Sequence, residues 1–159
     1  MKLHLPEAAA TDELAARLGA VLPADISGWT MLLEVELGAG KSTFARALIH
    51  AMGHAGAVPS PTYTLVEPYQ LPAGTVYHID LYRVSSEEEL RFLGWTELED
   101  GFRLVEWPQR VPGLQESADL MLHLDYVDHG RQAELIPLSE RAENLISRLD
   151  EQANTQLQD

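Results

Sequence analysis

A glycine-rich loop, set between an apolar run and a segment of helical periodicity, constrains the fold of this chain more than any other feature. Residues 35–43 have the sequence Val-Glu-Leu-Gly-Ala-Gly-Lys-Ser-Thr. A phosphate-binding loop of the Walker A type has a glycine, four free positions and then Gly-Lys-Ser/Thr. Its backbone N–H groups and a helix N-terminus cradle phosphates, while the lysine reaches the terminal phosphates and the hydroxyl holds Mg²⁺. Gly40, Lys41 and Ser42 fit this pattern, whereas Val35 stands where the first glycine is expected.

The sequence on either side of the loop supports the same interpretation. Residues 29–35 form an apolar run typical of a buried strand, and apolar residues then recur at helical spacing up to Gly53. A strand, a loop and a helix in this order predict nucleotide binding. The alternative is that Gly38 and Gly40 only make a tight turn. We expect Val35 to keep an ordinary β conformation at the end of the strand, because most of the amides that would cradle phosphates follow it.

The size and charge of the chain narrow the class of protein. With 159 residues, of which 45% are hydrophobic, the chain can form one domain, expected at 1–149 and followed by a polar tail at 150–159. It has no cysteine, which excludes disulfides and thiolate metal sites. The net charge of −14 repels a phosphate backbone, so we expect no direct nucleic-acid binding. Neither a signal peptide nor a membrane span is recognisable, and a cytoplasmic protein is expected.

Periodicity and turn residues predict the remaining elements. A β-hairpin is expected around the turn Asp128-His129-Gly130, and helices are expected after the N-caps Thr11 or Asp12, Ser86 and Ser139. The expected strands are 2–5, 29–35, 75–79, 101–106, 118–127 and 131–137, and the expected helices are 12–22, 44–52, 87–93 and 140–149.

Two carboxylates follow predicted strands directly. Asp80 comes after the strand at 75–79, in the position where open α/β sheets place ligand groups, and it is a candidate Mg²⁺ ligand. Glu106 ends the strand at 101–106 and could bind Mg²⁺ or orient an attacking water. The alternative for Glu106 is an exposed residue at the end of a strand.

A hydroxyl segment and an aromatic ring are further candidates. The segment 59–64 contains two prolines that restrict the backbone, and its Thr62 or Thr64 could sense a phosphate or a metal as part of a switch. The alternative is a rigid turn with its hydroxyl in solvent. The ring of Trp107 either anchors the loop after Glu106 or stacks on a nucleotide base, and we include it among the candidate nucleotide contacts.

Four stretches together resemble the TsaE (YjeE) family of small bacterial P-loop ATPases. They are 37–43, 60–68, 78–83 and 104–108, and the resemblance extends from residue 5 to about residue 149. It implies a three-layer α/β fold of the P-loop NTPase type, with a mostly parallel sheet, helices on both faces and an antiparallel C-terminal hairpin. It also implies an Mg²⁺-dependent ATPase required for making threonylcarbamoyladenosine in tRNA. Such an ATPase acts with a threonylcarbamoyl-transferase subunit and its non-catalytic paralogue, of the TsaD and TsaB type, and does not modify tRNA itself.

The resemblance also implies roles for individual residues. Lys41 would bind phosphates, Ser42 and Glu106 would hold Mg²⁺, Asp80 would be the essential Walker B-like carboxylate, and Thr62 would be the switch hydroxyl. The remaining residues that resemble nucleotide contacts are Gly38, Ala39, Gly40 and Thr43 in the loop, and Thr11, Gln109 and Arg131 outside it.

Two other functions remain open from the residues alone. The first is a small-molecule kinase, which usually needs a lid with several arginines, and the basic residues of this chain show little clustering. The second is a nucleotide-dependent binding module that does not hydrolyse ATP.

Overall fold

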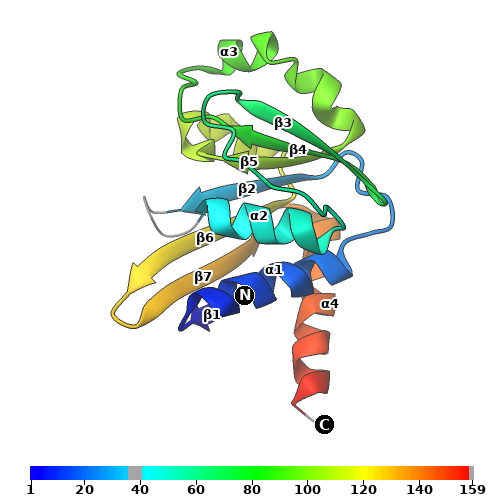
Figure 1. Cartoon of the computed structure of the whole chain (residues 1–159), viewed down its shortest axis with the longest axis vertical. Helices are drawn as coiled ribbons and strands as arrows, with labels where there is room; N and C mark the ends of the chain where they lie inside the picture. Colours follow the sequence, from blue (N-terminus) through cyan, green and yellow to red (C-terminus); the bar gives the residue numbers. More distant parts are fainter. Residues whose placement is uncertain (36–40, 158–159) are drawn as a thin grey trace.

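The computed structural model describes residues 1–35 and 41–157 as one seven-stranded sheet with helices on both faces (Figure 1). The strand order is β1-β7-β6-β2-β5-β4-β3. The strands are β1 (Lys2–Leu5), β2 (Thr30–Val35), β3 (Val66–Leu71), β4 (Gly74–Asp80), β5 (Phe102–Glu106), β6 (Leu120–Val127) and β7 (Gly130–Pro137). The helices are α1 (Ala8–Val21), α2 (Lys41–Ala51), α3 (Glu87–Phe92) and α4 (Glu140–Gln156), with 3₁₀ helices η1 (Trp95–Asp100), η2 (Pro108–Arg110) and η3 (Pro112–Glu116).

The expectation of a mostly parallel sheet is wrong. Strands β6, β2, β5 and β4 form a parallel centre, whereas β1 pairs with β7, β7 with β6, and β3 with β4 in antiparallel orientation. The reason lies in the connections, because strands joined by a turn of two residues can only be antiparallel neighbours. The β6–β7 hairpin confirms the prediction around residues 128–130, but the β3–β4 hairpin was not foreseen. Pro68 interrupts the strand pattern of β3, and a proline is tolerated there because β3 lies at the edge of the sheet.

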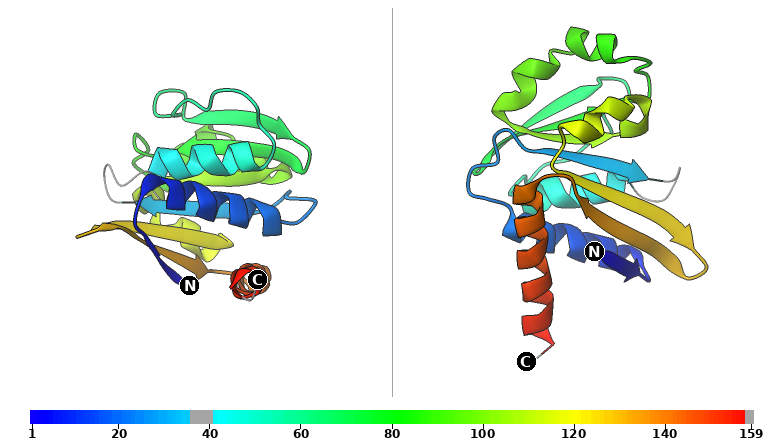
Figure 2. Two further views of the ribbon diagram at one scale, coloured as in Figure 1. Left: turned by 60° about the horizontal axis from the view of Figure 1, so that its bottom comes forward. Right: turned by 180° about the vertical axis from the view of Figure 1, so that it is seen from behind.

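The two faces of the sheet are buried against different helices. Met31, Leu33 and Val35 of β2 pack into the larger core, which includes the apolar residues of α1, α2 and α4. Leu32 points to the opposite face, into a smaller core under α3 and the 3₁₀ helices. This alternation along β2 follows from the two-residue period of a strand. Figure 2 shows α1 and α2 side by side on one face.

Two helix N-termini differ from the sequence-based expectation, and a third agrees with it. Helix α1 begins at Ala8, so Thr11 lies buried within the helix and does not cap it, and the run of alanines before Thr11 explains the earlier start. Ser86 precedes α3 but its side chain makes no capping hydrogen bond, and the Glu89 carboxylate accepts hydrogen bonds from Ser85. Ser139 does cap α4, accepting from the Ala142 N–H at 3.3 Å.

Helix α4 continues past the expected end of the domain. Residues 150–156, predicted as a polar tail, are helical, and their side chains are mostly exposed as the helix projects from the body (Figure 1). Glutamate, glutamine and alanine in this stretch favour a helix without needing a core to bury. None of the helices among the described residues is long and apolar enough to cross a membrane.

Candidate functional site

The two strand-end carboxylates lie next to each other in the sheet. Asp80 is the last residue of β4, Glu106 is the last residue of β5, and the two are register partners in this parallel pair. Since partners on neighbouring parallel strands point to the same face, their side chains share one environment. Both are buried, with exposed fractions of 1% for Asp80 and 0% for Glu106. Burial of two carboxylates is costly unless they are hydrogen-bonded or paired, which marks this edge of the sheet as a candidate site.

Hydrogen bonds join Asp80 to the proline-rich segment. The Tyr82 N–H donates to Asp80 Oδ1 at 2.8 Å, and the Thr62 hydroxyl donates to Oδ2 at 3.2 Å. Ser60 Oγ lies 2.8 Å from Thr62 Oγ1, and the Asp80 N–H donates to the Leu65 carbonyl at 2.9 Å. The hydroxyl of Thr62, the candidate switch residue, is therefore hydrogen-bonded to Asp80, the candidate Walker B-like carboxylate, and does not simply face solvent.

The backbone is strained on both sides of the carboxylates. In the described part of the chain, the non-glycine residues with positive φ are Leu65, at 69°, and Trp107, at 60°. The Leu65 N–H donates to the Pro61 carbonyl at 2.7 Å while its own carbonyl holds Asp80, and Trp107 follows Glu106 directly. A left-handed conformation at such residues costs of order 1–3 kcal/mol, and such strain concentrates at functional sites. Both strained positions adjoin the two buried carboxylates.

A buried histidine that the sequence analysis passed over contacts Glu106. His78 Nε2 lies 3.2 Å from Glu106 Oε2, and the ring has an exposed fraction of 1%. The signal was available in the sequence, because residues two apart on a strand share a face. Once Asp80 is a candidate ligand on β4, the same alternation brings His78 to its side of the sheet.

Aromatic and arginine side chains from the segments that adjoin the carboxylates in the sequence pack on one another. The rings of Tyr82 and Trp107 are 4.9 Å apart, and the Arg110 guanidinium lies 5.1 Å from the Tyr82 ring centre. Arg83 lies 4.7 Å over the ring of Tyr63, which is 79% exposed. Trp107 is half-buried in this packing, and Gln109 is exposed on η2.

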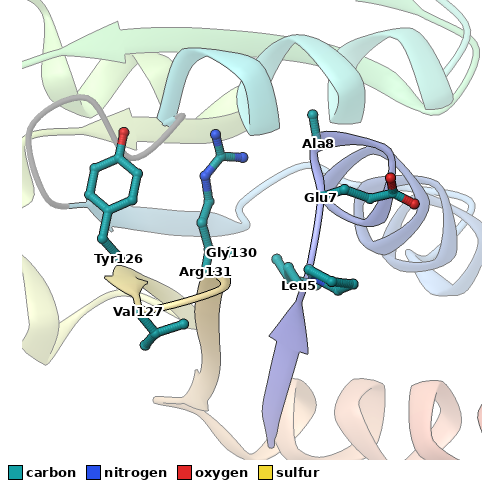
Figure 3. A pocket seen from close by; sticks show the side chains of 8 residues that line it. Leu5, Glu7, Ala8, Tyr126, Val127, Gly130 and Arg131 are labelled. Carbon is teal, nitrogen blue, oxygen red and sulfur yellow. The ribbon is translucent and has the colours of Figure 1, made fainter.

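Thr11 and Arg131, both candidate nucleotide contacts, meet on the other side of β2. Arg131 Nη1 donates to Thr11 Oγ1 at 3.2 Å, between β7 and α1. Arg131 also lines a pocket of about 320 Å³, and Figure 3 shows its side chain extending beside that of its strand partner Tyr126. The pocket is lined by Leu5, Pro6, Glu7, Ala8, Tyr126, Val127, Gly130 and Arg131. The candidate contacts thus fall into two groups, with Trp107 and Gln109 after β5 and with Thr11 and Arg131 beyond β6.

The glycine-rich loop itself lies largely outside the described residues. This holds for Gly38, Ala39 and Gly40, and also for the side chains of Lys41 and Ser42, although Lys41 is the first residue of α2. Thr43 is half-buried in the first turn of that helix. Val35 ends β2, pairs with Leu124 of β6 and is buried in the larger core, without a positive φ. The expected β conformation of Val35 is therefore confirmed.

Val35→Gly is expected to leave ATP affinity within about tenfold of the wild-type value, because the valine occupies an unstrained strand position. The same change should lower the free energy of unfolding by about 1.5–3 kcal/mol through loss of buried apolar area. Titration of tryptophan fluorescence with ATP, together with urea unfolding, measures both. A gain in affinity well beyond tenfold would show that valine strains the loop.

The chemistry of these side chains suits Mg²⁺ bound together with a phosphate. Asp80, Glu106 and Thr62 offer the hard oxygen ligands that Mg²⁺ prefers. Among the described residues, no group of three or more His, Cys, Asp or Glu side chains is arranged to hold a metal ion. Mg²⁺ does not need such a cage, since it usually binds through one or two carboxylates, waters and substrate phosphates. The arrangement therefore fits this ion as part of a nucleotide complex.

Known proteins match the chain over most of its length. The family model described as threonylcarbamoyl adenosine biosynthesis protein TsaE matches residues 5–134. The tRNA threonylcarbamoyladenosine biosynthesis protein TsaE of Haemophilus influenzae is 42% identical over 117 residues, which are 72% of this chain and 74% of the relative. The protein of that name from Nostoc sp. is 34% identical over 152 residues, which are 92% of this chain and 91% of the relative.

A solved structure supports the same relationship. The crystal structure of YdiB from Bacillus subtilis is similar with a TM-score of 0.74 and 25% identity, covering 96% of this chain and 95% of YdiB. Sequence and fold thus agree over the region that contains β2, α2 and both buried carboxylates. The family model and the two relatives show that this chain belongs to the TsaE family, which is named for the biosynthesis of threonylcarbamoyladenosine.

Proposed function

We propose that the chain is an Mg²⁺-dependent ATPase of the P-loop type that serves threonylcarbamoyladenosine synthesis in tRNA by acting on a partner enzyme. The observation that carries the proposal is the pairing of Asp80 and Glu106, with Thr62 held on Asp80, beside the strand that leads into the glycine-rich loop. Glu106 is in register with Leu33 of β2, and α2 begins at Lys41, directly after that loop. The names of the relatives support the place in tRNA modification.

Each residue of the site would have a distinct task. Lys41 and the N-terminus of α2 would bind the phosphates, and Ser42, Glu106 and Asp80 would hold Mg²⁺. When bound, the ion supplies positive charge against the phosphate oxygens as hydrolysis proceeds. Thr62 would respond to the bound phosphates, because a nucleotide that changes the hydrogen bond between Thr62 and Asp80 would also shift the segment 60–65.

The pocket beside Arg131 is a suitable place for the nucleoside. It lies across β2 from the carboxylates, and Arg131 with its partner Thr11 stands at its side. The planar guanidinium of an arginine donates N–H hydrogen bonds and also stacks on flat rings, so it could contact either a base or a ribose. Gln109 and Trp107 would then serve the phosphate end of the nucleotide.

The surface favours a protein partner over tRNA. The net charge of −14 disfavours direct binding of a nucleic acid. The exposed rings of Tyr63 and Tyr82, with Arg83 and Arg110 against them, are of the kinds enriched in protein interfaces. We propose that this surface meets a transferase complex of the TsaD and TsaB type in the cytoplasm.

The ATPase proposal is tested with purified protein, Mg²⁺ and labelled ATP, with and without the transferase subunits. We expect the chain alone to release free phosphate slowly and the partners to raise this rate at least about tenfold. The reason is that contact with a partner would bring the switch segment around Thr62 into its active conformation. Label transferred to a small acceptor would instead identify a kinase. Binding of ATP with no release of phosphate under either condition would identify a binding module. Lys41→Ala, which removes the phosphate-binding ammonium group, is the negative control.

A further inference from the structure

The buried ring of His78 has no role in the function proposed above, and its contacts are unusual. Its Nε2 atom is 3.2 Å from Glu106 Oε2, at the point where both side chains are buried. Its Nδ1 atom is buried and finds no hydrogen-bond partner among the described residues. A buried polar atom without a partner costs free energy, and such an atom in a native structure calls for an explanation. If the ring only filled the core, an apolar side chain could fill the same space without the free-energy cost of an unpaired polar atom.

The direction of the hydrogen bond follows from the chemistry of the two groups. An ionised carboxylate only accepts hydrogen bonds, so Nε2 carries the hydrogen and donates it to Oε2. In a neutral ring Nδ1 is then an acceptor, and no donor among the described residues reaches it. The position of His78 is fixed by β4, whose register with β5 sets His78 opposite Leu104 and Asp80 opposite Glu106.

We infer that His78 is a positioning residue for Glu106, orienting the carboxylate that would hold the Mg²⁺ of the bound nucleotide. The terminal torsion of a glutamate is broad, so a carboxylate without a fixed partner samples many orientations. Because the His78 ring is buried on β4, its donation to Oε2 restricts the plane of the carboxylate before any nucleotide arrives. Ligating carboxylates commonly need such hydrogen-bonded support, and removing it typically costs 10–100-fold in metal affinity or activity. This inference rests on the proposed function of the site.

Two substitutions separate the hydrogen bond from the bulk of the ring. In glutamine the Nε2 atom is the same number of bonds from Cβ as in histidine, so His78→Gln keeps a donor within reach of Glu106. In asparagine the amide nitrogen is one bond closer to the backbone, so His78→Asn keeps polarity but withdraws the donor. ATP affinity is measured calorimetrically for each protein with Mg²⁺ and with EDTA, and the ratio of the two affinities reports the contribution of the ion.

The expected result is that His78→Asn reduces this ratio about 10–100-fold while affinity in EDTA stays near the wild-type value, and that His78→Gln keeps most of the ratio. An unchanged ratio in His78→Asn would overturn the inference, as would an equal loss in both variants. Thermal unfolding of the free proteins shows whether each variant is folded. If the wild-type chain itself showed no Mg²⁺-dependent ATP binding, the proposed function would fail together with the inference.

A measurement on the unmodified chain covers the case in which the variants do not fold. The ¹⁵N shifts of the imidazole rings report which nitrogen carries the hydrogen, and the chain has six histidines. The His78 signal, assigned by comparison with Glu106→Gln and with any folded His78 variant, should show hydrogen on Nε2 and should move when Mg²⁺ and ATP are added together. A ring carrying its hydrogen on Nδ1 alone would contradict the donor assignment and with it the positioning role.

Discussion

Asp80→Asn and Glu106→Gln are each expected to lower the rate of ATP hydrolysis by more than about tenfold, which corresponds to about 1.4 kcal/mol of lost transition-state stabilisation. Both substitutions keep the shape of the side chain but remove a negative charge at the ends of β4 and β5. Nucleotide binding should persist in part, because Lys41 and the amides of the loop remain. Single-turnover hydrolysis with Mg²⁺, together with ATP titration of each variant, separates the loss of chemistry from the loss of binding.

The amide of Asp80→Asn also changes the hydrogen bonding around it. The aspartate accepts from the Tyr82 N–H on one oxygen and from the Thr62 hydroxyl on the other, whereas an amide has only one acceptor oxygen. Thr62 must then accept from the amide instead of donating, which loosens the switch segment as well as removing the charge. Asp125→Asn is the matched control, because Asp125 lies on β6 in a partly exposed pair with His123, and hydrolysis should be unaffected. Unchanged hydrolysis in both Asp80→Asn and Glu106→Gln would remove the two residues from the mechanism.

Elements that depend on a few neighbouring residues, such as turns and helix caps, could be predicted from the sequence. The turn at 128–130 predicts the β6–β7 hairpin, and Ser139 predicts the start of α4, because each depends on a few neighbouring residues. Asp80 and Glu106 could be identified as strand-end residues for the same reason. That they are register partners could not be read from either strand alone, since register is decided by the packing of whole strands against the core.

The errors come from features that depend on distant parts of the chain. The edge strand β3 was missed because an internal proline argues against a strand unless the strand is known to lie at an edge. The sheet was expected to be mostly parallel because the β3–β4 hairpin and the pairing of β1 with β7 were not foreseen. Strand alternation places His78 on the same face as Asp80, but its contact with Glu106 could not be predicted, since Glu106 lies 28 residues away on another strand. A second buried polar residue, Asp119, was passed over for a similar reason.

Asp119 joins three elements that are far apart in the sequence. Its carboxylate is 5% exposed and accepts from the Thr30 N–H at 3.0 Å, from the Ser139 hydroxyl at 2.9 Å, and from Arg141 Nε at 2.7 Å and Nη2 at 2.8 Å. Arg141 in turn lies 4.3 Å over the ring of Trp29. The start of β2, the start of β6 and the first turn of α4 are thus held by one side chain.

Asp119→Ala is expected to lower the free energy of unfolding by about 2–3 kcal/mol, because it leaves the buried Thr30 N–H without an acceptor and removes the charged hydrogen bonds from the partly exposed Arg141. Urea unfolding measures the change. Asp150→Ala on the exposed part of α4 is the control, with an expected change within about 0.5 kcal/mol. A loss for Asp119→Ala no larger than that of the control would show that water replaces the carboxylate without cost.

The contribution of Asp119 should also depend on pH, and its direction follows from the pKa of this carboxyl. Burial disfavours the charged form, but the hydrogen bonds from Arg141, from the Thr30 N–H and from Ser139 outweigh it and hold the pKa below its ordinary value of 3.8. A group whose pKa is lower in the folded state contributes stability above its unfolded pKa and loses it as the pH falls through the folded pKa. The difference in unfolding free energy between the wild-type chain and Asp119→Asn should therefore be constant above about pH 5 and should shrink as the pH falls below about 4. Urea unfolding across this pH range tests the direction of the change. A difference that grows toward acid pH would mean that the pKa of Asp119 in the folded state lies above its ordinary value. The hydrogen bonds from Arg141 would then fail to compensate for the burial of Asp119.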